Sequence, residues 1–306
     1  MDKNIQYIEK RLGASLDELK EFPRYFLIET IKGCNARCVM CPLGESKRKN
    51  GVMDDCLFEK IVNEINEHKE AVRQIGLYLM GEPLLDKGIF KKIKMFRRLD
   101  VKDIILASNG SLLNEKNNEE LLASGLNRIY ISIDGFSKGS YESIRKGLSY
   151  DILVENVKSL LKQRDENKSS LRIRLQYILQ KENAAEVKQW ISFWQQYIKE
   201  QDELKVIKVT NWGEHVDIHD FDIERRGEPC VSPFGTMIIL YDGTVPLCCA
   251  DVDGQIALGS VKDSSIKGIW QGKKVQKVRE DFLKDSVDIS FCKKCNVWRD
   301  DKYCEL

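Results

Sequence analysis

Arg24-Tyr-Phe-Leu-Ile-Glu-Thr-Ile-Lys32 runs directly into Gly33-Cys34-Asn-Ala-Arg-Cys38-Val-Met-Cys41. The first part has the apolar, β-branched character of a buried strand, so the cysteines are predicted to lie on the loop at its C-terminal end, where open α/β and barrel folds bind ligands. Three thiolates at this spacing can hold three corners of a [4Fe-4S] cube and leave the fourth iron open. A structural zinc is the alternative, but such sites usually take four ligands, and neither a histidine nor a fourth thiolate lies nearby.

Downstream of this motif, short β-branched runs alternate with helical patterns, which is the signature of βαβ units and a mainly parallel sheet. Amphipathic segments such as Leu57–His68 and Val187–Lys199 separate the runs, and Asn114–Ser124 ends at Gly125, a common helix C-cap residue. Six strands are predicted: Tyr25–Ile31, Gln74–Leu79, Asp103–Ser108, Arg128–Ile133, Leu171–Leu179 and Lys205–Asn211.

The composition of the chain narrows its class. Its 306 residues are 42% hydrophobic, and 49 basic against 48 acidic residues leave a net charge of +1, which gives no reason to expect nucleic acid or an anionic membrane as partner. No apolar run of about eighteen residues or more occurs, and the N-terminus lacks the apolar core of a signal peptide. The ten cysteines cluster in metal-ligand spacings rather than spreading as bridges, so we expect a cytoplasmic protein with no membrane partner.

The CxxxCxxC spacing after a first strand resembles the signature of the radical S-adenosylmethionine (radical SAM) superfamily, although Met40 stands where an aromatic residue is usual. The resemblance implies an α/β fold with a partial (β/α)6 barrel whose strand ends form one rim. It also implies a [4Fe-4S] cluster whose open iron binds S-adenosyl-L-methionine, a 5′-deoxyadenosyl radical that abstracts hydrogen from the substrate, and an electron donor such as flavodoxin or ferredoxin.

Each predicted strand is followed by polar residues that match family motifs. Met80-Gly81-Glu82-Pro83 resembles the Gly-Gly-Glu-Pro element, in which Glu82 would meet the cofactor ammonium, although alone it reads as a turn. Ser108-Asn109-Gly110 resembles Thr-Asn-Gly, and Asn-Gly is also a common turn. Ser132 and Asp134 alternate on one strand face and are predicted to reach a ribose together. Arg145 is predicted to pair with the cofactor carboxylate, its alternative being a solvated helix residue.

A second set of cysteines, Cys230, Cys248, Cys292 and Cys295, begins where the six-strand pattern ends. Thr236–Leu240 and Thr244–Leu247 are predicted to form a hairpin about Asp242-Gly243, followed by helices over Ser264–Trp270 and Lys273–Lys284. This layout resembles the SPASM/twitch auxiliary domain, in particular that of the aminocyclitol dehydrogenase of butirosin biosynthesis and of radical SAM proteins from sugar pathways. It implies one auxiliary [4Fe-4S] cluster in a small α+β domain, while an all-cysteine zinc site also fits the spacing.

The predicted domains are an N-terminal helix over 1–23, a partial barrel over 24–215 and an auxiliary domain over 216–306. Only the single helix Ile5–Lys20 is predicted before the first strand, where peptide-maturing relatives commonly carry a recognition domain, so a small substrate is favoured. Cys56, Cys249 and Cys304 remain outside both cysteine sets.

The resemblance leads to an expected reaction, oxidation of a carbinol carbon in a sugar, aminocyclitol or nucleotide-linked sugar, with the auxiliary cluster accepting an electron. Glu214 and His215 are candidate bases beside Trp212, whose indole suits stacking on a polyol or packing at a domain interface. Epimerisation with Cys249 as hydrogen donor and peptide maturation are alternatives within the superfamily. A non-catalytic iron-sulfur or zinc protein is the alternative outside it.

Overall fold

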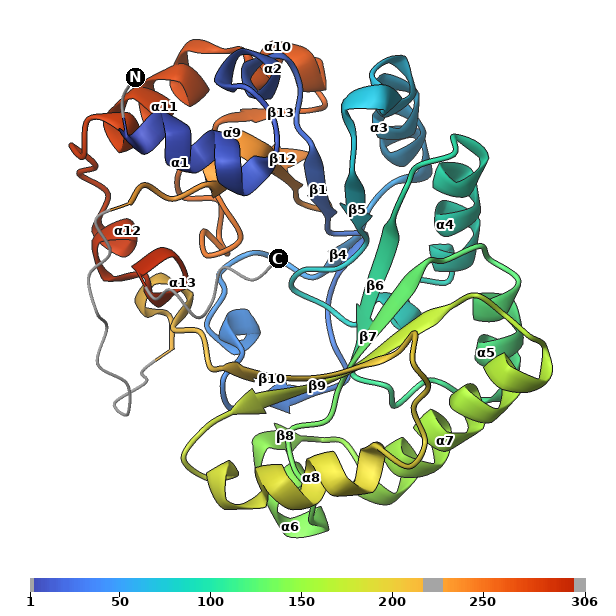
Figure 1. Cartoon of the computed structure of the whole chain (residues 1–306). Coiled ribbons are helices and arrows are strands. Elements are labelled where there is room, and N and C mark those ends of the chain that lie inside the picture. The colour runs from blue at the N-terminus through green and yellow to red at the C-terminus, as the bar shows by residue number, and fades with distance from the viewer. Residues whose placement is uncertain (1–2, 217–227, 300–306) are drawn as a thin grey trace.

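A seven-stranded, wholly parallel sheet forms the centre of the computed structural model, which describes residues 3–216 and 228–299 (Figure 1). Its order within these residues is β10-β9-β7-β6-β5-β1-β11. The expected α/β partial barrel is therefore confirmed, with one strand more than the six predicted. The strands are β1 (Tyr25–Ile28), β5 (Gln74–Gly76), β6 (Ile104–Ser108), β7 (Arg128–Ser132), β9 (Arg172–Leu179), β10 (Glu203–Lys208) and β11 (Thr236–Ile239).

Helices cover the outer face of this sheet, while its inner face is turned toward the C-terminal elements (Figure 1). Side-chain hydroxyl, amide or carboxylate oxygens cap several of their N-termini, as Asp54 does for α3, because they accept hydrogen bonds from free backbone N–H groups. The outer-layer helices are α3 (Asp55–Glu67), α4 (Ile89–Arg98), α5 (Glu115–Leu122), α6 (Lys138–Ile144), α7 (Tyr150–Glu166) and α8 (Val187–Trp194).

The two faces of the sheet differ in polarity. In β7, Ile129 and Ile131 are fully buried under the helices, whereas Arg128, Tyr130 and Ser132 alternate with them and are half-buried on the inner face. In β7, polar side chains thus stand where bulky apolar ones usually fill a closed barrel. This leaves the inner face able to line a polar site.

The seventh strand comes from beyond the predicted end of the barrel. β11 pairs in parallel with β1, whereas β12 (Thr244–Val245) pairs antiparallel with β13 (Gly259–Ser260). The predicted turn does form, since Leu240 N donates to Thr244 O at 2.9 Å and Gly243 has φ +89. The predicted pairing of its two arms differs because Met237, Ile238 and Ile239 are all buried, the continuous pattern of a parallel strand covered on both faces.

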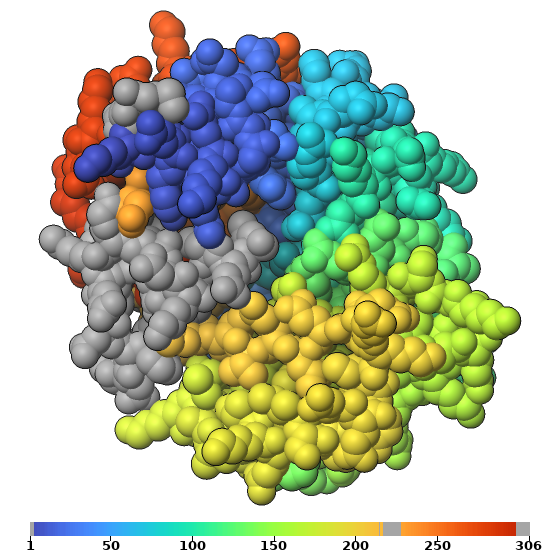
Figure 2. All heavy atoms as spheres, in the orientation of Figure 1, coloured from blue at the N-terminus to red at the C-terminus, as the bar shows by residue number. Residues whose placement is uncertain are grey.

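Two helices, α1 (Lys3–Leu12) and α2 (Leu16–Glu21), replace the single helix predicted at the N-terminus. The break follows from Gly13, whose φ of +62 ends α1, and from Ser15, which forms a capping box with Glu18. Ile8, Leu12 and Leu16 pack with Phe234 and Phe282, so these helices cover the C-terminal part of the chain (Figure 2).

The C-terminal elements are short helices around the second cysteine set, on the inner side of the sheet (Figure 1). Helices α10 and α11 lie within the ranges predicted for them. In the described ranges, no helix combines the length and the apolar character needed to cross a membrane. The helices are α9 (Ser232–Gly235), α10 (Ile266–Trp270), α11 (Lys273–Leu283), α12 (Ser290–Lys294) and α13 (Asn296–Arg299).

Candidate functional site

The loop that carries the first three cysteines is closed at its base by two short strands. β2 (Ile31–Lys32) pairs antiparallel with β4 (Gly51–Val52), which brings the two ends of the loop together. Gly81 approaches the start of the loop so closely that a Cβ there would lie 2.3 Å from Ile31 O. Glu82 N then donates to Gly33 O at 2.9 Å. The predicted Gly-Glu-Pro element is thereby fixed against the cysteine loop by its backbone.

The thiols of this loop are held by neighbouring polar groups. Asn109 Nδ2 lies 3.7 Å from Cys34 Sγ, and Arg145 Nη1 lies 3.5 Å from Cys38 Sγ. Burial raises the pKa of Cys34 to about 11 and also raises that of Cys41. All three thiols of the loop line the same cavity, so the loop is suited to act as a metal ligand set.

Glu82 lies beside these thiols with its carboxylate buried. Its Oε1 accepts from Ser108 Oγ at 2.8 Å and its Oε2 accepts from Asn109 N at 2.7 Å, so the end of β6 orients it. Burial raises the pKa of Glu82, and the hydrogen bonds from Asn109, Leu84 and Ser108 act in the opposite direction. A buried carboxylate held in this way is a natural counter-charge for a cationic ligand.

Arg145 is held by Asp134, and this corrects one prediction. Asp134 is fully buried, and its Oδ2 accepts from Arg145 Nε at 2.6 Å while its Oδ1 accepts from Ile178 N at 2.7 Å. Because β7 ends at Ser132, strand alternation no longer sets the direction of Asp134, which does not join Ser132 at the cavity wall. Asp134 instead orients the guanidinium of Arg145, which does reach that wall.

These groups surround one cavity of about 320 Å³ at the C-terminal ends of the strands. The rim of a parallel sheet brings together motifs that are far apart in the sequence, as expected for this architecture. Tyr78, Gln176 and Lys208 also line it and were not predicted, although the pairing of Gln176 with Ser132 on the neighbouring strand would have indicated Gln176. The predicted residues in its wall are Cys34, Cys38, Cys41, Glu82, Ser108, Asn109, Ser132 and Arg145.

The segment after β10 has a mixed outcome. Trp212 lines the cavity, and its Nε1 donates to Met40 O at 3.2 Å, which ties it to the cysteine loop. Asn211 instead binds the C-terminal elements, donating from Nδ2 to Lys294 O at 2.7 Å. His215 is half-buried and is not among the residues that line the cavity, and the structure describes only the backbone of Glu214. Both remain predictions as bases.

The second cysteine set converges as predicted, on a small cavity between α9, α12 and the loop after β12. Cys230, Cys248, Cys292 and Cys295 line it together with Cys249. Burial, followed by the charges of these neighbouring thiols, raises the pKa of Cys248 well above its usual range. Cys56 is an exposed thiol away from both sets, and Cys304 lies outside the described residues.

The two thiol sets fit clusters better than single metal ions. Among residues 3–216 and 228–299, no three His, Cys, Asp or Glu side chains are close enough to share one metal ion. The thiols instead line the walls of cavities, and all nine cysteines of this part of the chain are free of disulfides. In a [4Fe-4S] cube each thiolate binds a different corner, so its ligands stand further apart than those of a zinc ion. Three thiols around the larger cavity therefore fit a cube with one open corner.

Cys249 belongs to the second site, since it lines the auxiliary cavity with the four cysteines of that set. Burial and the charge of Cys295 raise the pKa of Cys249 to about 11. The charge of Cys249 is also one of the influences, after burial and Tyr130, that raise the pKa of Tyr78 in the wall of the first cavity.

Comparison with known families agrees with these two sites. The model of the Radical SAM superfamily matches residues 28–191, and that of the SPASM iron-sulfur cluster-binding domain matches residues 230–296. The first match covers more than half of the chain and includes the first cysteine set. The second begins at Cys230 and includes Cys248, Cys292 and Cys295.

Curated relatives carry the name GTP 3′,8-cyclase. The protein of Peptoclostridium acidaminophilum is 32% identical over 139 residues, which are 44% of this chain and 41% of the relative. A probable GTP 3′,8-cyclase of Saccharolobus solfataricus is 22% identical over 89% of this chain and 93% of its own length. The matches near 30% identity thus span less than half of those relatives.

Solved structures share the fold. BtrN in complex with AdoMet and 2-DOIA has a TM-score of 0.64 at 20% identity, over 90% of this chain and 93% of BtrN. SuiB of Streptococcus suis bound to its precursor peptide SuiA has a TM-score of 0.71 at 15% identity, over 98% of this chain and 80% of SuiB. At these identities the likeness concerns the fold alone, and it extends over both cysteine sets.

Proposed function

The chain belongs to the radical SAM superfamily, and we propose that within it the protein is an oxidoreductase of a carbohydrate-like small molecule. It is a radical SAM enzyme, and its cofactors are a [4Fe-4S] cluster, S-adenosyl-L-methionine and an auxiliary iron-sulfur cluster. The proposed substrate is a sugar, an aminocyclitol or a nucleotide-linked sugar, and the proposed product is the ketone formed at one of its carbinol carbons.

Cys34, Cys38 and Cys41 are proposed to hold three corners of the first cluster, with the open corner toward the 320 Å³ cavity. A cluster held there would supply the reducing electron for cleavage of S-adenosylmethionine and hence for hydrogen abstraction from the substrate. Glu82 and Arg145 place one negative and one positive charge in the same wall. This arrangement suits the ammonium and carboxylate of the methionine moiety, with Arg145 held in place by Asp134.

The observation that supports the oxidoreductase proposal is the second set of converging cysteines, which suits an auxiliary iron-sulfur cluster in addition to the first one. A carbinol carbon that has lost one hydrogen atom becomes a ketone only after its hydroxyl proton and one electron leave. Cys249 of the second cavity is one of the charges that raise the pKa of Tyr78 in the wall of the first cavity. The auxiliary cluster is therefore proposed as the electron acceptor, and Glu214 or His215 as the base.

The substrate class rests on the polar groups that lie among apolar residues in the cavity wall. Ser132, Gln176 and Thr210 offer hydrogen-bonding groups, and the Trp212 indole lies in the same wall. Hydroxyl-rich rings are bound by such a combination of polar groups and an aromatic face. A flavodoxin or ferredoxin is the proposed electron donor, and the reducing cytoplasm is the proposed location because both sites need free thiols.

Three other reactions are candidates. Cys249 is the proposed donor if a hydrogen atom is returned to the substrate radical, which would give an epimer instead of a ketone. Ring closure of a nucleotide is suggested by the names of the curated relatives. Maturation of a peptide, as the SuiB complex illustrates for that protein, is a third candidate.

The decisive experiment is an anaerobic assay of the reconstituted protein with S-adenosylmethionine, dithionite and a substrate panel. The panel contains nucleotide-linked sugars, aminocyclitols and GTP, each also in deuterated form. Oxidation predicts a ketone, one 5′-deoxyadenosine per ketone, and transfer of the carbinol deuterium into that nucleoside. An epimer that contains solvent deuterium, and that is not formed by Cys249→Ala, would show that the reaction is epimerisation and not oxidation. A cyclised product of GTP would show that it is ring closure.

A further inference from the structure

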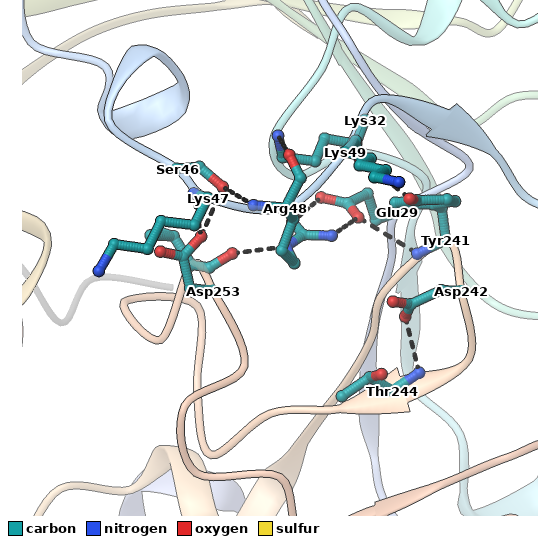
Figure 3. A network of polar contacts seen from close by, with 11 residues as sticks. Glu29, Lys32, Ser46, Lys47, Arg48, Lys49, Tyr241, Asp242, Thr244 and Asp253 are labelled. Carbon is teal, nitrogen blue, oxygen red and sulfur yellow. Dashed lines mark hydrogen bonds and ion pairs between the residues drawn. The ribbon is translucent and has the colours of Figure 1, made fainter.

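A buried ion pair joins the end of β1 to the far end of the cysteine loop. Glu29 has no exposed side-chain surface, and that of Arg48 is 10% exposed. Arg48 Nη1 donates to Glu29 Oε2 and Nη2 donates to Glu29 Oε1, both at 2.7 Å (Figure 3). This is the two-pronged geometry in which a guanidinium binds a carboxylate most strongly and with a fixed orientation.

The remaining nitrogen of the same guanidinium contacts the auxiliary cysteine loop. Arg48 Nε donates to Val252 O at 2.7 Å, and Val252 follows Cys248 by four residues. Next to it, Asp253 Oδ1 accepts from Ser46 Oγ at 2.6 Å and from Lys47 N at 3.0 Å. Residues 46–48, which follow Cys41, are thus bound directly to residues 252–253 (Figure 3).

The turn after β11 completes this connection. Tyr241 N donates to Glu29 Oε2 at 3.2 Å, and Tyr241 Oη donates to Lys49 O at 3.0 Å. The Tyr241 ring lies so close to Gly51 that a Cβ there would come within 2.3 Å of it. The Glu29 carboxylate therefore accepts hydrogen bonds from Arg48, which follows the cysteine loop, and from Tyr241 in the turn after β11.

Stability alone is a weak reason to keep such a pair. Removing two charges from water costs several kcal/mol per ion, and well-packed apolar residues often replace a buried pair without loss of stability. Apolar residues would not supply the directional bonds that fix Val252 and Tyr241 relative to Glu29. The two-pronged geometry of the pair therefore serves to hold Val252 and Tyr241 in place relative to Glu29.

We propose that Arg48 and Glu29 are positioning residues that hold the Cys34–Cys41 loop and the Cys248–Cys249 loop at a fixed separation. The inference deepens the proposed function, on which its role in catalysis rests, because electron transfer from a substrate radical to the auxiliary cluster depends on that separation. The structural part concerns the two loops themselves and is independent of the substrate.

The test uses the reconstituted full-length protein with Arg48→Lys. A lysine keeps the charge opposite Glu29, but its donors sit on one nitrogen, which cannot form the planar fork to both carboxylate oxygens and also reach Val252 O. The matched control is Arg164→Lys. Arg164 makes the same two-pronged pair with Asp202, at 2.7 and 2.8 Å and with its side chain 1% exposed, but contacts neither cysteine loop. Asp253→Ala, which removes only the contacts to Ser46 and Lys47, serves if Arg48→Lys does not fold.

Hydrogen-deuterium exchange is expected to rise about tenfold in both residues 42–52 and 247–255 of Arg48→Lys, and in neither segment of Arg164→Lys. The magnetic coupling between the two reduced clusters, read from electron paramagnetic relaxation, is expected to change only in Arg48→Lys. Faster exchange confined to residues 42–52, or equal effects of the two lysine variants, would overturn the proposal. If the wild type oxidises no carbinol substrate, the proposed function fails while exchange and coupling still decide this inference.

Discussion

Asn211 and Asn296 exchange hydrogen bonds between the rim of the barrel and the auxiliary elements. Asn211 N donates to Asn296 Oδ1 at 3.0 Å, and Asn296 N donates to Asn211 Oδ1 at 3.3 Å. Asn296 Nδ2 also donates to Val209 O at 3.0 Å. Both residues are buried, and Asn296 directly follows Cys295. Cys295 of the second cysteine set thus directly precedes a residue that is hydrogen-bonded to the barrel.

Replacing this amide should loosen the auxiliary site. Asn296→Ala leaves the N–H of Asn211 and the carbonyl of Val209 without their side-chain partner in a buried place, at a cost of about 1–3 kcal/mol in the free energy of unfolding. Urea unfolding of the reconstituted protein measures this loss. Asn167→Ala is the control, because Asn167 is exposed and its amide donates only within the last turn of α7. Equal midpoints for the two variants would contradict the assigned role.

The first cysteine set should account for one cluster. Reconstituted wild type is expected to contain about eight irons and the Cys34→Ala/Cys38→Ala/Cys41→Ala variant about four, as for two [4Fe-4S] clusters of which one is lost. Only the wild type should release 5′-deoxyadenosine from S-adenosylmethionine under dithionite. Cys56→Ser is the matched control, since Cys56 is exposed and outside both sets, and it should keep both values. An unchanged iron content in the triple variant would refute the assignment.

Much of the fold follows from the sequence because alternation and turn chemistry act locally. Strands β6, β7 and β9 lie where periodicity predicts them, and Gly125 has the φ of +83 expected at a helix C-cap. The partner of a strand is a non-local property, which is why the pairing of β11 with β1 was not predicted. Likewise, the division between α1 and α2 depended on Gly13 and Ser15, two ordinary signals inside one amphipathic pattern.

The candidate site was predictable where a motif carries its own chemistry. Cysteine spacing and the polar residues at strand ends indicated most of the cavity wall. Asp134 was predicted to lie on the same face as Ser132 because strand alternation was assumed to continue to Asp134, whereas β7 ends at Ser132. Arg48 and Glu29 gave no signal at all, since a single charged residue in a strand and another in a loop reveal their pairing only in three dimensions.

Gly81 should tolerate no side chain. Gly81→Ala places a Cβ 2.3 Å from Ile31 O and 3.0 Å from Gly33 O. Both are backbone atoms, so the cysteine loop or the Glu82 segment must shift. Overpacking of this kind costs about 1–3 kcal/mol and should lower the melting temperature. Gly139→Ala is the opposite control, because Gly139 lies in α6 with open space around it and should gain up to about 1 kcal/mol in the free energy of unfolding. A melting temperature of Gly81→Ala equal to that of the wild type would show that the loop can move freely.

Arg145 should matter more for its geometry than for its charge. In the wild type, Nε and Nη2 of Arg145 contact Asp134 while Nη1 faces Cys38 Sγ. Arg145→Lys keeps a cation but cannot make these contacts at the same time. The affinity for S-adenosylmethionine, measured by calorimetry on the reconstituted protein, is expected to fall about tenfold, the effect of losing about 1.4 kcal/mol. Lys146→Arg controls for composition, because Lys146 is the exposed neighbour on the same short strand. Affinity equal to wild type in Arg145→Lys would leave the proposed carboxylate partner unsupported.

Glu82 should give the protein a distinct pH dependence. Its folded pKa is raised by burial above the ordinary value of 4.5, so the folded state holds its proton more tightly than the unfolded state. The contribution of this carboxyl to stability is therefore lost as the pH rises from about 4.5 through its raised folded pKa, and the loss is constant above it.

In Glu82→Gln this change is absent, because the amide does not titrate. Urea unfolding of the metal-free proteins across this window should show wild type losing stability relative to Glu82→Gln. Asp134, whose pKa burial also raises, is common to both proteins and cancels in the difference. A wild type that gains stability relative to Glu82→Gln over the same range would mean that the hydrogen bonds to Glu82 outweigh its burial.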